Sequence, residues 1–391
     1  MEFRRINTLP PYVFTIIDAL KVEARRAGRD VIDLGFGNPD LPSPDIAVEK
    51  LTEAAHNARN HRYSASRGIP KLREAAAAMY QRRWGVNLDP GTEVINTIGA
   101  KEGFTHLMWT LLQPGDLALV PAPSYPIHIW GPILTGAAIR EVPLAEGDEF
   151  IENLQRSYEY AWPKPRVLVI SFPHNPTTVC VDLAFFQKVV DFCRDRNMIV
   201  VHDNAYADIG FDGYDPPSIL QADGAKECAV ELYSMTKSYS MAGWRIAFMS
   251  GNAEVVAALA KLKSYLDYGA FQPIQIAATV TLNEEPEYPK LVRDIYQSRR
   301  DVLCDGLASI GWDVGRPKGT MFVWAPIPAQ YRELGSVEFA SFLVREAGVA
   351  TSPGVGFGPG GEGHVRFALI ENEQRTRQGI RNLRKALPRL S

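Results

Sequence analysis

One lysine in this sequence lies among residues that could make its amine reactive. Lys237 follows Ser234 and Thr236 and precedes Arg245 by eight positions. A neutral lysine amine can form an imine with an aldehyde and can then move protons at the adjacent carbon. The spacing lets Ser234 and Arg245 reach one dianion, and arginine offers the planar, bidentate donor that phosphate favours. The alternative is a surface lysine in a hydroxyl-rich loop.

A carboxylate follows another apolar stretch of the chain. Asp203 comes after Met198-Ile-Val-Val, which predicts a buried strand. An unpaired carboxylate at the end of a buried strand is unfavourable, so Asp203 is expected to have a cationic partner. A protonated ring nitrogen would be such a partner, and a basic side chain nearby is the alternative.

The elements that must position these residues alternate between strand and helix. Strands are predicted at 94–98, 116–120, 166–172 and 198–204, and helices at 100–112, 125–134 and 182–196. This order predicts an α/β domain with a mainly parallel sheet, whose ligands gather at the carboxyl ends of the strands, where Tyr125, Asn175 and Asp203 fall. The turn at Gly99-Ala100-Lys101 opens a helix and suits a phosphate.

A second, smaller α+β domain is predicted after a strand at 243–251. Residues 286–391 contain a long helix to Ile310, a strand at 319–324, a helix at 336–347 and a strand at 364–369. We expect a large domain at 45–285, and a small domain made of 286–391 and the N-terminal arm at 1–44. Gly356, Gly358 and Gly361 match GxGxxG, but a strand follows them, which excludes a dinucleotide fingerprint. Arg366 lies in the last strand and needs an anionic partner.

The bulk composition excludes several classes of function. The 391 residues are 46% hydrophobic, 22% charged and carry a formal net charge of -3, so no basic face for nucleic acid is expected. The sequence shows no signal peptide and no apolar run of membrane-spanning length, which predicts a cytoplasmic protein without a membrane partner. The four cysteines lack metal-binding or disulfide spacing, and no metal site is predicted.

Nine motifs in order along the chain resemble those of one enzyme family. They are Gly37-Asn-Pro-Asp40, Tyr63 with Gly68-Ile-Pro70, Gly99-Ala-Lys-Glu-Gly103, Ser124-Tyr-Pro126, Asn175-Pro-Thr177, Asp203-Asn-Ala-Tyr206, Ser234-Met-Thr-Lys237, Gly243-Trp-Arg245 and Arg366. In these motifs the sequence resembles the class I/II aminotransferases, pyridoxal-phosphate enzymes of the aspartate aminotransferase fold type. The resemblance implies a seven-stranded sheet flanked by helices, with the smaller domain beside it.

The resemblance also implies a role for each motif residue. Lys237 would hold the coenzyme, pyridoxal 5′-phosphate, as an imine, and Asp203 would keep its ring nitrogen protonated. The other coenzyme contacts would come from Asn175 and Tyr206 at the phenolic oxygen, Tyr125 on the ring, and Ser234, Arg245 and the Ala100 and Lys101 amides at the phosphate. Tyr63 would reach the phosphate of the neighbouring subunit, which implies a homodimer. Gly37, Asn175, Arg366 and Tyr12 would bind the substrate, with Arg366 on its α-carboxylate.

The expected reaction is transamination by a ping-pong mechanism. The segments at 10–14, 64–68, 124–128 and 267–274 resemble bacterial alanine (glutamate-pyruvate) aminotransferases, so glutamate and alanine are the expected donors. Aspartate and LL-diaminopimelate aminotransferases are alternatives, and Arg67 is a candidate for binding a distal carboxylate. A lyase with the same coenzyme and a non-catalytic sensor module stay open as other classes.

Overall fold

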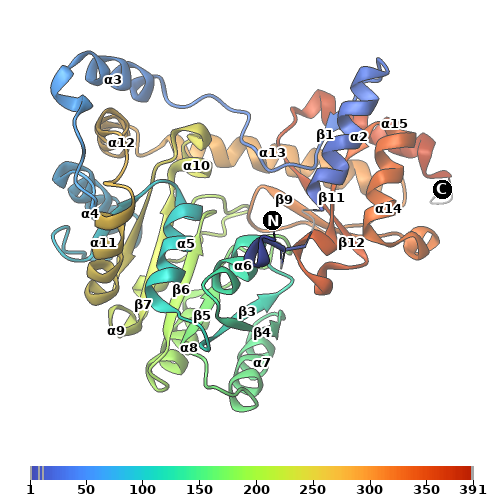
Figure 1. Cartoon of the computed structure of the whole chain (residues 1–391). Coiled ribbons are helices and arrows are strands. Elements are labelled where there is room, and N and C mark those ends of the chain that lie inside the picture. The colour runs from blue at the N-terminus through green and yellow to red at the C-terminus, as the bar shows by residue number, and fades with distance from the viewer. Residues whose placement is uncertain (1, 8, 11–12, 389–391) are drawn as a thin grey trace.

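A seven-stranded sheet forms the centre of this computed structural model, which describes residues 2–7, 9–10 and 13–388 (Figure 1). The strand order is β2-β8-β7-β6-β5-β3-β4, and the sheet is parallel except for β8, which runs against both neighbours. Its strands are β2 (Val94–Thr97), β3 (Leu117–Ala122), β4 (Ala138–Pro143), β5 (Val167–Ile170), β6 (Ile199–Asn204), β7 (Ala229–Ser234) and β8 (Ala247–Gly251). The predicted fold class is confirmed.

Helices cover both faces of this sheet because alternate strand residues point to opposite sides. Leu168 of β5 belongs to an apolar cluster with Phe186 of α8, whereas Val169 belongs to a second cluster with Phe104 of α5 and Val256 of α11. The helices in this part of the chain are α3 (Asp45–His56), α4 (Pro70–Trp84), α5 (Ala100–Leu111), α6 (Pro126–Leu134), α7 (Asp148–Glu159), α8 (Leu183–Arg194), α9 (Ala225–Cys228), α10 (Met235–Ser238), α11 (Ala253–Leu266) and α12 (Gln272–Glu284).

Two smaller sheets lie on the other side of the molecule. The strands β11 (Ser352–Pro353), β12 (His364–Ala368) and β9 (Phe322–Pro326) form an antiparallel sheet in that order, and β1 (Ile32–Asp33) pairs in parallel with β10 (Val349–Ala350). The remaining helices are α1 (Arg4–Asn7), α2 (Phe14–Arg26), α13 (Tyr288–Ala308), α14 (Gly335–Phe342) and α15 (Glu373–Ala386). Figure 1 shows α13 extending from the large sheet toward the small ones. The division at residues 45 and 285 stays a prediction.

Two predicted strand boundaries are wrong, each because of a left-handed backbone. The strand predicted at 243–251 begins only at Ala247, since residues 242–244 form a 3-10 turn and Arg245 has φ 52°. The strand predicted at 319–324 begins at Phe322, after Thr320 with φ 72°. A strand cannot contain such conformations. The glycine-rich segment ends in β12 as predicted.

Within the described part of the chain, no helix combines the length and the apolar composition that crossing a membrane requires.

Candidate active site

A cavity of about 400 Å³ lies at the carboxyl edge of the large sheet, facing the small sheets. The strands β2, β3, β5, β6 and β7 all end at this edge because they are parallel, and β8 begins there because it is antiparallel. The predicted residues that line the cavity are Gly37, Ala100, Lys101, Tyr125, Asn175, Asp203, Tyr206, Ser234, Lys237, Arg245 and Arg366. The topology therefore brings together residues that are far apart in the sequence.

Lys237 lies in α10, the single helical turn that follows β7. Ser234 is the N-cap of this turn, and its hydroxyl accepts from the Thr236 amide at 3.2 Å. Burial, together with the positive charges of Arg366 and Arg245, lowers the pKa of Lys237 to about 7. A lysine with this pKa is about half neutral at pH 7, and the neutral amine is the form that attacks a carbonyl carbon. Its Nζ donates to the Gly37 carbonyl at 2.5 Å.

Asp203 directs one carboxylate oxygen at a histidine and leaves the other without a partner. Oδ2 lies 2.9 Å from His128 Nε2, whose Nδ1 lies 3.2 Å from the Ser124 hydroxyl. The Nε2–H donates, since a carboxylate can only accept. Oδ1 is buried and has no hydrogen-bond partner among the described residues. The alternative partner, a basic side chain nearby, is thus present but satisfies only one oxygen of this carboxylate, and Asp203 lines the cavity.

The turn that opens α5 lies directly against an arginine. Gly99 has φ 80°, and a Cβ built there would lie 2.2 Å from Arg245 Nη2. Only glycine allows this approach. Ala100 and Lys101 follow as the first residues of the helix, whose amides lack helical acceptors and carry the positive end of the helix dipole. The turn and the guanidinium together form a site that favours an anion, with Ser234 also in the lining.

A chain of hydrogen bonds joins the small sheet to the large one. Arg366 of β12 donates from Nη1 to Asn175 Oδ1 at 2.7 Å, and Asn175 Nδ2 donates to the Tyr206 hydroxyl at 3.2 Å. Burial raises the pKa of Tyr206 well above its ordinary value, so its hydroxyl stays protonated at neutral pH. The Arg366 guanidinium stacks 3.9 Å from the Phe322 ring centroid. This packing fixes the direction of the arginine's donors.

Two of the residues named from the sequence, Tyr63 and Arg67, do not line the cavity. Tyr63 is 87% exposed, and its ring contacts that of Tyr268 at 5.1 Å between centroids, tilted by 41°. Arg67 donates to the Thr92 carbonyl at 3.3 Å, away from the cavity. Tyr12 lies outside the described residues.

No role was predicted for His128, which lines the cavity. The same holds for an aromatic wall of the cavity, formed by Phe14, Phe36, Phe322 and Phe357. One signal for His128 was available. It lies three residues after Tyr125, and side chains at that spacing share a helix face. The phenylalanines come from four separate segments, and no local pattern connects them.

Comparison with known proteins agrees with this geometry. Residues 29–381 match the family model of aminotransferase class I and II. The chain is 52% identical to the glutamate-pyruvate aminotransferase AlaC of Escherichia coli (strain K12), over 98% of this chain and 93% of that protein. It is 44% identical to an LL-diaminopimelate aminotransferase of Moorella thermoacetica, over 99% and 98%.

Solved structures agree as well. Substrate-bound BacF from Bacillus subtilis superposes with a TM-score of 0.92 at 36% identity, covering 98% of this chain and 97% of that one. The chain therefore belongs to the class I and II aminotransferases, enzymes of the aspartate aminotransferase fold that depend on pyridoxal 5′-phosphate.

Proposed function

We propose that this aminotransferase moves the amino group between glutamate or alanine and the 2-oxo acids pyruvate and 2-oxoglutarate. The observation that carries the proposal is a lysine with a pKa of about 7 in one cavity with Asp203, Arg245 and Arg366. Similarity to a glutamate-pyruvate aminotransferase over nearly the whole chain supports these substrates. LL-diaminopimelate is the second candidate substrate, because several relatives with 40–44% identity carry that name. Aspartate is a third.

Two features of the cavity fit the coenzyme. The unpartnered Oδ1 of Asp203 is a buried acceptor of the kind that a protonated ring nitrogen satisfies. The Gly99 turn, the α5 amides, Ser234 and Arg245 together suit a dianionic phosphate. When bound, pyridoxal phosphate takes up the electron density that remains as the substrate loses its Cα proton.

The chain's own residues supply proton transfer and orientation. Neutral Lys237 would accept the Cα proton as a general base and then deliver it to the coenzyme carbon on the other side of the nitrogen. A protonated lysine could not accept the proton in the first place. His128 holds the Asp203 carboxylate in place through the 2.9 Å hydrogen bond. Asn175 and the protonated Tyr206 hydroxyl would offer donors to the coenzyme's phenolic oxygen, and Tyr125 would cover its ring; all three line the cavity. Catalysis thus rests on Lys237, Asp203 and Tyr206.

The substrate α-carboxylate is assigned to Arg366. Three neutral oxygens orient its guanidinium: Asn175 Oδ1 at 2.7 Å, the Gly35 carbonyl at 3.2 Å and the Ser352 hydroxyl at 3.3 Å. Gly37 and Asn175 complete the carboxylate site. A planar guanidinium held in this way binds a carboxylate with two parallel hydrogen bonds. Tyr12, outside the described residues, is the remaining candidate.

A homodimer is the proposed catalytic unit. Tyr63, Tyr265, Tyr268 and Phe271 form an aromatic patch on one chain, with 87%, 83%, 55% and 47% of their surfaces exposed. Large aromatic rings are enriched in the buried centres of protein interfaces. The proposal assigns the coenzyme phosphate a further contact, from Tyr63 of the partner subunit. The cytoplasmic location stays a prediction.

The test is a panel of amino donors against pyruvate and 2-oxoglutarate with purified holoenzyme. The proposal expects the highest kcat/KM for glutamate with pyruvate and for alanine with 2-oxoglutarate. A kcat/KM at least tenfold higher for LL-diaminopimelate or aspartate would replace the donor assignment. Release of ammonia or an eliminated product in place of a new amino acid would indicate a lyase and contradict the proposal.

A further inference from the structure

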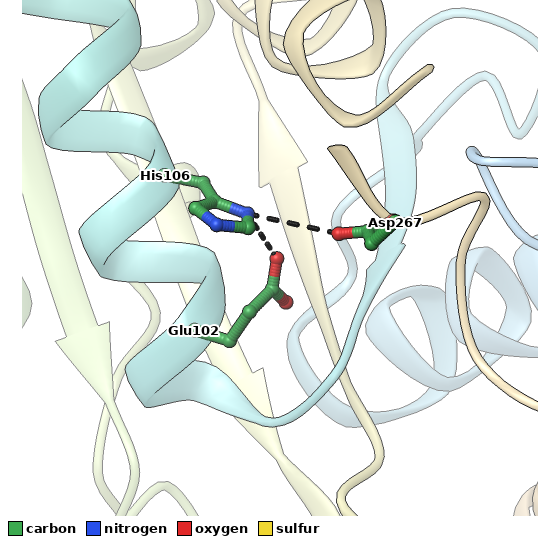
Figure 2. Close-up of side chains that lie close together, drawn as sticks. All are labelled: Glu102, His106 and Asp267. Atoms are coloured by element: carbon green, nitrogen blue, oxygen red, sulfur yellow. Dashed lines mark ion pairs between the residues drawn. The ribbon is translucent and has the colours of Figure 1, made fainter. Parts of the chain in front are cut away.

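A cluster of charged side chains lies beside the turn that opens α5, outside the cavity. In Figure 2, dashed lines join His106 to Glu102 and to Asp267. His106 Nδ1 is 2.5 Å from Glu102 Oε1 and 3.7 Å from Asp267 Oδ2. Lys263, on α11, donates to Glu102 Oε1 at 2.9 Å and to Asp267 Oδ2 at 2.8 Å. Two helices and the loop after α11 therefore meet in one network.

The cation of this cluster is part of the chain. Glu102, His106 and Asp267 have the ligand atoms and the proximity that a metal ion needs. However, the ammonium of Lys263, which is fully buried, already bonds both carboxylates. A metal would have to displace that ammonium into an apolar surrounding at high cost. Although burial opposes ionisation, His106 and Lys263 together hold the pKa of Glu102 well below its ordinary value, so its carboxylate is charged.

One side of the cluster holds the phosphate-binding turn. Glu102 Oε2 accepts from the Ile98 amide at 2.6 Å. Ile98 directly precedes Gly99, the residue that lies against Arg245, and Ala100 and Lys101 follow. Glu102 thus follows the phosphate-binding amides in the helix, and its carboxylate holds the backbone that precedes them, at Ile98. Its own position depends on Lys263, which neutralises its charge.

The other side of the cluster holds the turn that supports Tyr63. Asp267 Oδ1 accepts from the Gly269 amide at 2.7 Å, which closes a turn around Tyr268 with φ 53°. A Cβ on Gly269 would lie 2.8 Å from the Ala65 carbonyl, so this turn packs closely on the segment after Tyr63. The Tyr268 ring packs against the Tyr63 ring, tilted by 41°.

We infer that Lys263 is a positioning residue that joins two phosphate contacts of the enzyme. One is the α5 turn, which binds the coenzyme of the same chain, and the other is Tyr63, which contacts the coenzyme of the neighbouring subunit. The inference rests on the proposed function, because it takes the Gly99 turn and Tyr63 as phosphate ligands. Loss of the ammonium leaves two carboxylates facing each other, and both turns then shift. The expected consequence is a weaker affinity for pyridoxal phosphate, with little change in the affinity for pyridoxal, which lacks the phosphate.

The test compares pyridoxal phosphate with pyridoxal, which lacks the phosphate, on the apoenzyme of Lys263→Met. We expect the dissociation constant for pyridoxal phosphate to rise about tenfold or more, and that for pyridoxal to change by less than about threefold. Lys21→Met is the matched control. Lys21 is also a buried lysine between two carboxylates, Asp18 at 2.6 Å and Asp33 at 2.7 Å, but it lies in α2, away from the phosphate turn. The Lys21→Met variant should keep both dissociation constants within about twofold of the wild-type values.

Equal loss of both ligands in Lys263→Met, or no loss of either, would overturn the inference. If that variant does not fold, Lys263→Gln, which removes the charge but keeps a hydrogen-bond donor between the two carboxylates, allows the same comparison. A wild-type protein that binds pyridoxal as tightly as pyridoxal phosphate would contradict the proposed function itself, so the two failures are distinguishable.

A double-mutant cycle tests the link to Tyr63. Tyr63→Phe and Lys263→Met should be non-additive in their effects on pyridoxal phosphate affinity, since each removes part of the same support. Their combined loss should be at least about threefold smaller than the product of the single losses. Additive losses would contradict the link.

Discussion

His128 and Asp203 form the hydrogen bond on which the orientation of the buried carboxylate depends. The 2.9 Å contact from Nε2 occupies Oδ2 and leaves Oδ1 directed elsewhere in the cavity lining, without a described partner. The second imidazole nitrogen lies 3.2 Å from the Ser124 hydroxyl, which keeps the ring from turning. Oδ2 thus holds the carboxylate in place through His128, and Oδ1 is the oxygen that we propose for the coenzyme's ring nitrogen.

Asp203→Asn should therefore lower kcat by about 10²–10³-fold, because the amide keeps the shape but not the charge that stabilises the ring's proton. Coenzyme content, measured by absorbance after denaturation, should stay near one per subunit. Steady-state kinetics with glutamate and pyruvate provide the measurement. A kcat within about threefold of wild type would contradict the role of this carboxylate.

The rate at which the apoenzyme takes up pyridoxal phosphate should rise with pH. Burial and the charges of Arg366 and Arg245 lower the pKa of Lys237 from 10.5 to about 7, so the reactive neutral amine increases as pH rises through that value. The expected rate increases about tenfold from pH 6 to pH 8 and then levels off. Stopped-flow absorbance measures it, and a rate that keeps rising tenfold per unit up to pH 10 would disprove the shift.

Gly99→Ala should weaken coenzyme binding as well as destabilise the fold. The added Cβ would lie 2.2 Å from Arg245 Nη2 and must displace the guanidinium from the phosphate site. Gly85→Ala is the control, since Gly85 also has a positive φ, 69°, but open space around it. Gly85→Ala should lose about 1–2 kcal/mol of unfolding free energy from left-handed strain. Gly99→Ala should lose about 1–3 kcal/mol, because φ 80° with ψ 156° lies in a region that only glycine populates readily.

Isothermal titration calorimetry should give a dissociation constant for pyridoxal phosphate that is raised about tenfold or more in Gly99→Ala and unchanged in Gly85→Ala. Unchanged affinity in Gly99→Ala would remove this turn from the phosphate site.

Arg366→Lys should raise KM for the amino acid about 10–100-fold while coenzyme affinity stays near wild type. Lysine keeps the charge but loses the paired donors and the stacking on Phe322. Initial rates over a range of glutamate concentrations give KM, and spectroscopic titration gives coenzyme affinity. An unchanged KM would assign the α-carboxylate to another residue.

The part of the site that could be predicted lies in short, continuous motifs. Ser234, Lys237 and Arg245 are close in sequence, and the structure places all three in the cavity lining. The end of β6 at Asn204, next to Asp203, follows from an apolar run that any buried parallel strand requires. Such signals are local, so one sequence suffices to read them.

The rest depends on contacts between distant segments. His128 and Asp203 are 75 residues apart, and Lys237 meets a carbonyl 200 residues away, at Gly37. The edge strand β4 was not predicted, because five of its six residues are partly or fully exposed and no apolar run marks it. The outward direction of Tyr63 follows from the turn that Asp267 closes, which no motif near Tyr63 indicates.

The most direct test of the central claim is a single half-reaction of purified holoenzyme with excess glutamate or alanine and no acceptor. The account predicts that the yellow chromophore bleaches, that one 2-oxo acid per subunit is released without ammonia, and that added pyruvate restores the colour. Lys237→Ala should show no such cycle. Bleaching without a 2-oxo acid, release of ammonia, or full turnover by Lys237→Ala would contradict it.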